Sequence, residues 1–334
     1  MKEMPKATEA EVELLEKNHW KTVLRGILSD WRLYVMLLPL SLVLLLWRYL
    51  PIGTMIMSFK YYVIDSSFGR GAYTSTFTGF ANFESLFSNY EFWSAFRNTF
   101  ALSFYGLIFG FPFPILLALF FSEIRIELYR SAVQIFSYLP KFISTVIVTT
   151  LIGMLLRSTI SAQVAAGPIG AIFESLFGLK NMVSSPKSFR SIYIISGLWE
   201  GAGYGSIVYF AAILGISPTN YEAARIDGAS KMQQIRYVTL PGMSATLVIM
   251  LILRLGQLLT IGYEKVYLLQ QLGTPESTYE TSQIISTYVI NRIMTNNSNQ
   301  GIGAAADLFN ALLSMVLVLG SNRIAKKVSS TSLF

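Results

Sequence analysis

The chain has no cysteine, a single histidine and little charge for its length. Among its 334 residues the only histidine is His19, and 13% are Asp, Glu, Lys or Arg, whereas about a quarter of an ordinary soluble domain is charged. The lack of cysteine excludes a disulfide framework, a thiolate metal site and a cysteine nucleophile. One histidine in a charged amino-terminal segment supplies no Ser-His-Asp set.

The sequence also lacks the motifs of an ATPase and the paired carboxylates of an acid-base catalyst. No Gly-Lys dipeptide occurs anywhere, so there is no Walker A loop to cradle phosphates. No two carboxylates fall at metal-binding or acid-base spacing within one apolar segment. We therefore predict that the chain is not an enzyme and has no catalytic residues, no metal site and no cofactor of its own.

Long apolar runs dominate the composition instead. Apolar residues make up 53% of the chain, and its mean hydropathy is +0.50. Crossing a bilayer takes roughly 20 apolar residues in a helix, because no water in the hydrocarbon core can satisfy the backbone. Six stretches meet this length: 33–57, 98–121, 132–156, 192–216, 243–261 and 302–321. These stretches predict an all-α integral membrane protein with six transmembrane helices.

Lysines and arginines are distributed unevenly between the segments that connect these stretches. With the amino terminus in the cytoplasm, basic residues are roughly twice as dense in the inner segments as in the outer ones, as the positive-inside rule expects. This topology accounts for the formal net charge of +7 without a nucleic-acid partner, since the basic residues form no dense stripe. Both termini are then predicted to be cytoplasmic.

We predict one membrane domain with two cytoplasmic tails. Residues 1–32 lack the short apolar core and cleavage site of a signal peptide, so we expect them to stay as a tail. An amphipathic helix on the membrane surface and an unstructured basic segment both remain open for this tail. The membrane domain covers 33–325 and includes a cytoplasmic loop at 217–242, and residues 326–334 form the carboxyl-terminal tail.

The polar loop between the fourth and fifth stretches has strong local signals. Thr219 and Glu222 have the spacing of a capping box, and Pro218 suits the entry of a helix. Gly228 then permits a bend, and a second helical segment is expected to stop at Leu240-Pro241, because proline cannot donate a hydrogen bond. The pattern predicts two short helices at an angle.

This loop resembles the EAA motif of the membrane subunits of binding-protein-dependent ABC importers. The motif consists of Glu-Ala-Ala, three residues, Gly, nine residues, an aliphatic residue, one residue and Leu-Pro. Val238 stands at the aliphatic position, where Ile is usual. The resemblance implies that the 219–243 loop docks into a separate ATPase. The residues expected to couple the two proteins are Glu222, Ala223, Ala224, Asp227, Gly228, Leu240 and Pro241.

The likeness extends beyond the loop to the branch of such permeases that imports oligosaccharides and polysaccharide fragments. It includes RNTF at 97–100, YLPKFIS at 138–144 and GYEKVYLL at 262–269. It implies a type I ABC importer permease (MetI-like) fold in a bacterial cytoplasmic membrane. It also implies a second homologous permease, two ATPase subunits that bind ATP and Mg²⁺, an extracytoplasmic solute-binding protein and an oligosaccharide substrate. A permease for an amino acid or phosphate, and a non-transporting membrane scaffold, remain alternatives.

Charged and aromatic residues within the apolar stretches are candidates for the substrate path. A charge near the middle of a membrane is costly, so it usually faces a bundle interior or a water-filled path. Arg254 lies near the middle of the fifth stretch, with Gln257 on the same helical face. Trp199, Glu200 and Tyr204 lie close together in the fourth stretch, where an aromatic ring beside a carboxylate suits a sugar. A structural ion pair between Arg254 and Glu200 is the alternative.

Overall fold

The computed structural model describes residues 28–62, 75–158, 166–273, 278–295 and 300–328. Most of the predicted amino-terminal tail, and the last residues of the carboxyl-terminal tail, lie outside these ranges. The described chain is helical, with one isolated antiparallel bridge between Lys60 and Phe77. It divides into two compact units, which meet in the chain at Ile56 and Met57.

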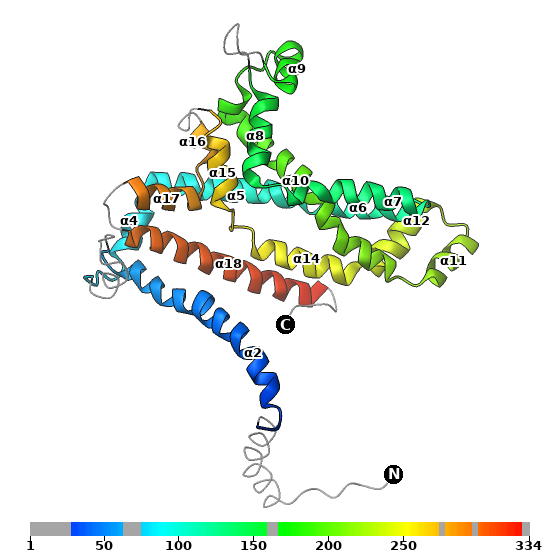
Figure 1. Ribbon diagram of the computed structural model, residues 1–334, viewed down its shortest axis with the longest axis horizontal. Coiled ribbons are helices and arrows are strands. Elements are labelled where there is room, and N and C mark those ends of the chain that lie inside the picture. Colours follow the sequence, from blue (N-terminus) through cyan, green and yellow to red (C-terminus); the bar gives the residue numbers. More distant parts are fainter. Residues whose placement is uncertain (1–27, 63–74, 159–165, 274–277, 296–299, 329–334) are drawn as a thin grey trace, which may run out of the picture. The chain divides into compact units, whose positions relative to one another are not determined.

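The first unit contains α2 (Trp31–Leu44) and the π-helical segment η1 (Leu45–Tyr49), and the 3-10 helix η2 (Leu50–Phe59) follows. The helices of the second unit, labelled in Figure 1, are α4 (Ala81–Phe87), α5 (Tyr90–Gly110), α6 (Pro112–Glu123), α7 (Glu127–Tyr138), η3 (Leu139–Phe142), α8 (Thr145–Leu156), α9 (Pro168–Phe177), η4 (Met182–Ser184), α10 (Pro186–Leu214), α11 (Pro218–Ile226), α12 (Lys231–Gln234), η5 (Ile235–Thr239), α13 (Leu240–Gly242), α14 (Ser244–Gly256), α15 (Tyr263–Gln270), α16 (Tyr279–Ser282), α17 (Ile285–Thr295) and α18 (Gly301–Val328).

Three helical segments of the described chain are long and apolar enough to cross a membrane. They are Trp31–Tyr49, Tyr90–Glu123 and Gly301–Lys326. Three further pairs of helices meet the combined test of length and composition together, and each pair is bent, so that the described chain has up to six candidate spans. The all-helical fold is as predicted, but the predicted stretches at 132–156 and 243–261 are not single straight helices.

The bends lie at identifiable places. Glu127–Phe142 meets α8 at 98°, where Ser144 caps the new helix by accepting a hydrogen bond from Val146 N–H. Helix α10 meets α11 at 70°, and the segment Lys231–Gly242 meets α14 at 66°. The predicted stretch at 132–156 is therefore not one straight helix, because the chain turns sharply in its middle, and it is a candidate span only as a bent pair.

The fifth predicted stretch, 243–261, is also not helical throughout. Helix α14 ends at Gly256, and its 13 residues rise only about 20 Å, less than the roughly 30 Å of a hydrocarbon core. The backbone beyond it is held by side chains: Asn310 Nδ2 donates to Leu259 O at 3.1 Å, and Ser286 Oγ donates to Ile261 O at 3.0 Å. These bonds satisfy carbonyls that a continuous helix would have satisfied itself.

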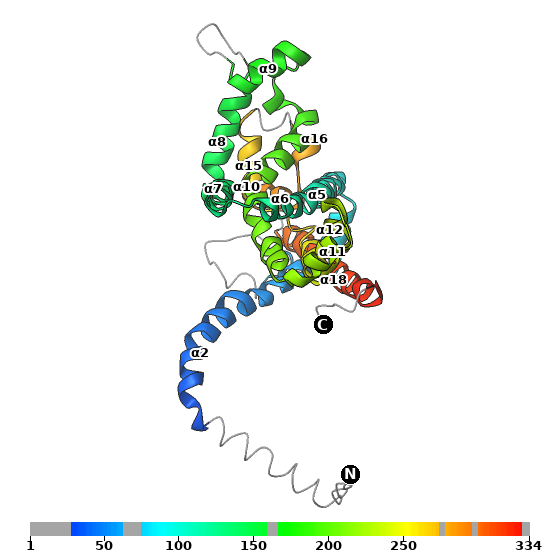
Figure 2. The same cartoon turned by 90° about the vertical axis from the view of Figure 1, so that its right-hand side faces the viewer.

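Helix α10 is the centre of the packing. It lies against α6 and α5 in both views (Figures 1 and 2) and also contacts α7 and η3. All but the last two residues of the predicted fourth stretch, 192–216, thus lie within one 29-residue helix despite its glycines. One of these glycines, Gly203, is required for packing, because a Cβ there would collide with the backbone carbonyl of Ser137. Only glycine allows α10 to pass so close to the end of α7.

Candidate functional site

The polar loop forms the expected pair of short helices, but its caps differ from those predicted. Helix α11 begins at Pro218 with Ser217 as its N-cap, and no side chain caps it. The predicted capping box at Thr219 and Glu222 is therefore wrong. The Thr219 hydroxyl is instead 2.7 Å from the hydroxyl of Ser217, because the helix starts two residues earlier than the pattern suggested. Pro218 at the first helical position is as predicted.

Gly228 ends α11 in a Schellman motif. Its φ of +77° lies in the left-handed region that favours glycine. Gly228 N–H bonds to Arg225 O at 3.1 Å, and Ala229 N–H bonds to Ala224 O at 2.9 Å. These two hydrogen bonds satisfy carbonyls that the helix end would otherwise leave free. The predicted bend at Gly228 is confirmed.

The capping box of this loop lies at the start of the second helix. Ser230 Oγ accepts from Gln233 N–H, and Gln233 Oε1 accepts from Ser230 N–H at 2.7 Å. The adjacent Gln234 is buried and donates to Ala229 O at 2.9 Å. Side chains and backbone thus fix the turn between the two helices without help from another protein.

The second helical segment does not stop at Leu240-Pro241, as predicted, but continues to Gly242. It widens into a π-helical turn at Ile235–Thr239, where Leu240 N–H bonds to Ile235 O. Pro241 then lies in the first turn of α13, where a backbone N–H has no partner within the helix, so that proline, which lacks the N–H, loses no hydrogen bond. The π turn lets the chain pass a proline and remain helical.

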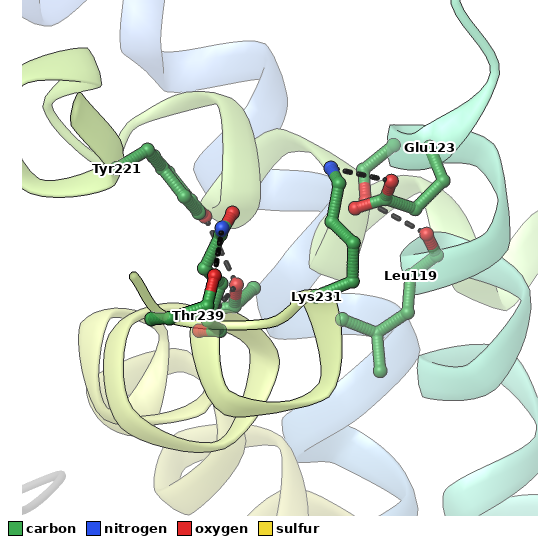
Figure 3. A network of polar contacts seen from close by, with 8 residues as sticks. Leu119, Glu123, Tyr221, Lys231 and Thr239 are labelled. Atoms are coloured by element: carbon green, nitrogen blue, oxygen red, sulfur yellow. Dashed lines mark hydrogen bonds and ion pairs between the residues drawn. The ribbon is translucent and has the colours of Figure 1, made fainter. Parts of the chain in front are cut away.

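Two side-chain contacts tie the loop together and to α6 (Figure 3). The hydroxyls of Tyr221 and Thr239 are 3.1 Å apart and join the two halves of the loop. Lys231 Nζ lies 2.7 Å from Glu123 Oε2 at the end of α6. The lysine and glutamate side chains are 60% and 45% exposed, so this ion pair contributes little to stability. It does specify where the loop meets the membrane helices.

The loop exposes large apolar side chains. Ile226 is 87%, Met232 72% and Tyr237 67% exposed. Of the residues predicted to couple to an ATPase, five are exposed and two half-buried: Glu222, Ala223, Asp227, Gly228 and Pro241 belong to the first group, and Ala224 and Leu240 to the second. An exposed apolar surface on a rigid loop is typical of a protein-binding site.

A second candidate site is a cavity of about 370 Å³ between α5, α10 and α14. One wall is made of glycines at intervals of four residues, which places them on one face of each helix. They are Gly106 and Gly110 of α5 and Gly197, Gly201 and Gly205 of α10. A Cβ at Gly110 or Gly201 would meet no atom within 4 Å. These two glycines therefore keep the cavity open rather than allow close packing.

The polar groups of the cavity come from three elements, η3, α10 and α14. Lys141, Glu200, Tyr204 and Arg254 all line it, so the structure brings three of the five predicted path residues together. Trp199 and Gln257 are exposed and do not line this cavity.

The partner of Glu200 is Lys265, not Arg254. Lys265 Nζ lies 2.9 Å from Glu200 Oε2, and both side chains are 15% exposed. The same ammonium lies 5.7 Å from the centre of the Tyr193 ring. The alternative of an Arg254–Glu200 pair is therefore wrong. Arg254 is exposed to the cavity and has no ion-pair or hydrogen-bond partner among the described residues.

Sequence reasoning missed Lys141, Lys265 and the glycine wall. The four-residue spacing of Gly197, Gly201 and Gly205 was visible in the sequence and could have indicated an open helix face. Nothing local marks Lys265 as the partner of Glu200, since 65 residues separate them. Within the described part of the chain, no three His, Asp or Glu side chains are grouped to hold a metal ion.

A helical membrane domain that encloses a polar cavity and carries a rigid, partly apolar loop has the features of a transport subunit. Residues 110–330 match the model of the family described as "binding-protein-dependent transport system inner membrane component". Because the match covers well over half of the chain, the chain belongs to this family. The predicted resemblance is confirmed, and the protein is a multi-pass inner membrane component of an ABC transporter.

Two curated relatives from Bacillus subtilis (strain 168) match almost the whole chain. The chain is 32% identical to the protein LplB over the full length of both. It is 34% identical to the polygalacturonan/rhamnogalacturonan transport system permease protein YteP, over 96% of each chain. Among solved structures, it is similar to a chain of a bacterial ABC transporter involved in the import of the acidic polysaccharide alginate. The two are 38% identical, with a TM-score of 0.79 over 92% of this chain and 99% of that one.

Proposed function

We propose that this chain is a permease subunit of an ATP-driven oligosaccharide importer. With a second, homologous permease it forms the path through the membrane, and the 219–243 loop couples that path to a separate ATPase. YteP is a polygalacturonan/rhamnogalacturonan transport permease, and the solved transporter named above is involved in the import of alginate, which supports a sugar substrate over an amino acid or phosphate. The complex would stand in a bacterial cytoplasmic membrane, with both termini of this chain inside.

The observation that carries this proposal is that two helices, α10 and α14, connect the loop to the cavity. Helix α10 lines the cavity with Glu200 and Tyr204 and then leads through its 70° bend directly into α11 of the loop. After the loop, α14 starts at Ser244 and brings Arg254 back to the same cavity. A displacement of the loop is thus transmitted to two walls of the cavity. Such a connection suits a path that alternates between two states.

The remaining partners would supply the functions for which this chain has no residues. Since the chain has no phosphate-binding loop, ATP and Mg²⁺ would bind to two copies of a cytoplasmic ATPase, and this chain would need no cofactor. An extracytoplasmic solute-binding protein would deliver the sugar. One solved structure similar to this chain, with the same identity and TM-score, contains an alginate pentasaccharide-bound periplasmic protein, which supports such a partner here.

The proposal is tested by reconstituting the chain in proteoliposomes with a second permease, ATPase subunits and a solute-binding protein from the same organism. We expect oligosaccharide-loaded binding protein to stimulate ATP hydrolysis and sugar uptake. Ile226→Asp places a charge on the most exposed apolar side chain of the loop and should weaken ATPase binding at least tenfold, as for a central interface residue. Ile226→Met is the matched control. Normal ATPase binding by Ile226→Asp would contradict the coupling role, and uptake of an amino acid or phosphate instead of a sugar would contradict the substrate class.

A further inference from the structure

The cavity on α10 carries an excess of positive charge. Its described lining contains two cations, Lys141 and Arg254, and one acid, Glu200. Glu200 is already paired with Lys265 at 2.9 Å. Neither Lys141 nor Arg254 has an ion-pair or hydrogen-bond partner among the described residues. Two uncompensated cations inside a membrane domain are costly unless an anion or water meets them.

A second cavity adjoins the first and has the same sign of charge. Its volume is about 520 Å³, and it shares Ile194 and Leu198 of α10 with the first cavity. Lys187 and Arg190 line it, and no acidic residue does so in the described chain. Arg190 donates from Nη2 to Asn98 Oδ1 at 2.9 Å, but its buried Nε–H has no hydrogen-bond partner among the residues that the structure describes.

The two cavities lie in series along one helix. Arg190 and Glu200 are ten residues apart on α10, which corresponds to about 15 Å along the helix axis. That distance exceeds the length of a single sugar ring or of a phosphate ion. A ligand that reaches both cavities at once must therefore be longer than a single sugar ring, and the cations that line each cavity favour negative charge on it.

We propose that the tandem cavities select an acidic oligosaccharide, in which sugar carboxylates bind Lys141 and Arg254 while the ring faces pass along the glycine wall. The guanidinium of Arg254 matches a carboxylate with two parallel hydrogen bonds. The bare helix surfaces at Gly110 and Gly201 leave room for a rigid ring beside these charges. This inference rests on the proposed function and specifies its substrate class.

The test separates charge from shape by using one sugar in two forms. The probes are a tetrasaccharide of hexuronic acid, with free carboxylates, and its fully methyl-esterified form, which is neutral. Binding of each is measured on the purified complex without the solute-binding protein, so that only the membrane path selects. We expect the acid to bind at least tenfold more tightly than the ester, because hydrogen bonds to charged groups are about twice as strong as neutral ones.

Substitutions then assign the preference to the two cations. Lys141→Gln and Arg254→Gln should each weaken binding of the acid about tenfold or more, and leave binding of the ester unchanged. Lys141→Arg and Arg254→Lys should retain most of the affinity. Arg323→Gln is the control, since Arg323 is exposed on α18 and lines neither cavity.

Two results would overturn the inference: tighter binding of the ester by the wild type, or unchanged binding of the acid by both Gln variants. If those variants do not assemble, Gly110→Asp decides, since its Cβ would meet no atom within 4 Å. The added carboxylate should weaken binding of the acid and spare the ester, and equal effects on both would reject a role for charge. Transport of neutral sugars alone would reject this inference but keep the proposed function, whereas transport of no sugar would reject the proposed function itself.

Discussion

The ion pair between Glu200 and Lys265 gives a prediction whose size follows from its burial. It joins α10 to α15 beside the cavity, with 2.9 Å between Nζ and Oε2 and only 15% of each side chain exposed. Lys265→Met keeps most of the volume of the side chain but leaves the Glu200 carboxylate without its partner. Removing one member of a buried pair costs about 3 to 5 kcal/mol. Because the pair is slightly exposed, we expect a loss near 3 kcal/mol.

An exposed ion pair in the same unit provides the matched control. Lys180 Nζ lies 3.4 Å from Glu174 Oε1, and the lysine side chain is 70% exposed. Lys180→Met makes the same chemical change in a solvated place, where an ion pair contributes about 0 to 1 kcal/mol. The difference between the two variants therefore isolates the effect of burial.

The measurement is the reversible unfolding of the purified complex in detergent, followed by the fluorescence of its tryptophans. The double variant Lys265→Met with Glu200→Gln removes both charges and should regain most of the lost stability, since a buried pair often contributes little beyond a neutral replacement. If Lys265→Met proves as stable as Lys180→Met, or if the double variant is no better than Lys265→Met, the pair does not hold the two helices as described.

Three further predictions concern the loop and the packing of α10. Gly228→Ala forces a side chain into the left-handed region at a cost of about 1 to 2 kcal/mol and should reduce substrate-stimulated ATP hydrolysis, whereas Gly228→Asn should stay close to the wild type. Equal ATP hydrolysis by the wild type and both variants would contradict the role of the turn in coupling. Met232→Cys, at a position 72% exposed, should react with an impermeant thiol reagent only in opened cells; labelling of intact cells would reverse the predicted topology. Gly203→Ala drives a Cβ into the Ser137 carbonyl and should lower the amount of folded protein in the membrane, while Gly201→Ala, which meets nothing, should not. Equal yields of the last two would argue against the close helix crossing.

Local chemistry allowed the sequence by itself to determine the loop and the class of the protein. Gly228 occupies a left-handed turn because only glycine does so without strain, and Pro218 starts a helix because its missing N–H costs nothing there. Apolar runs of bilayer length indicated a helical membrane protein for a similarly local reason, since each helix satisfies its own backbone. The loop motif then indicated the family, which the comparisons confirmed.

The ends of individual elements were less certain, because several local solutions compete. The capping box lies at Ser230 rather than at Thr219, since Ser and Thr both fit the pattern and the helix start is set by Pro218. The helix passes through Pro241 because a π turn before it removes the need for the missing hydrogen bond. Neither choice can be made from spacing alone.

Only the tertiary structure decided which charges meet. Arg254 and Lys265 were both available to Glu200, and the end of α14 at Gly256 is what places Lys265 on a separate helix beside it. The hydropathy of the sequence does not predict that helix end, because the carbonyls beyond it are satisfied by side chains far along the chain, such as Asn310, which donates to Leu259 O. Long-range partners depend on how helices cross and bend, and those crossings are set by packing between segments far apart in the chain, such as Gly203 against Ser137. The same packing leaves Lys141 and Arg254, which both line the cavity, without ion-pair or hydrogen-bond partners among the described residues. Their charge is what we expect to select the substrate.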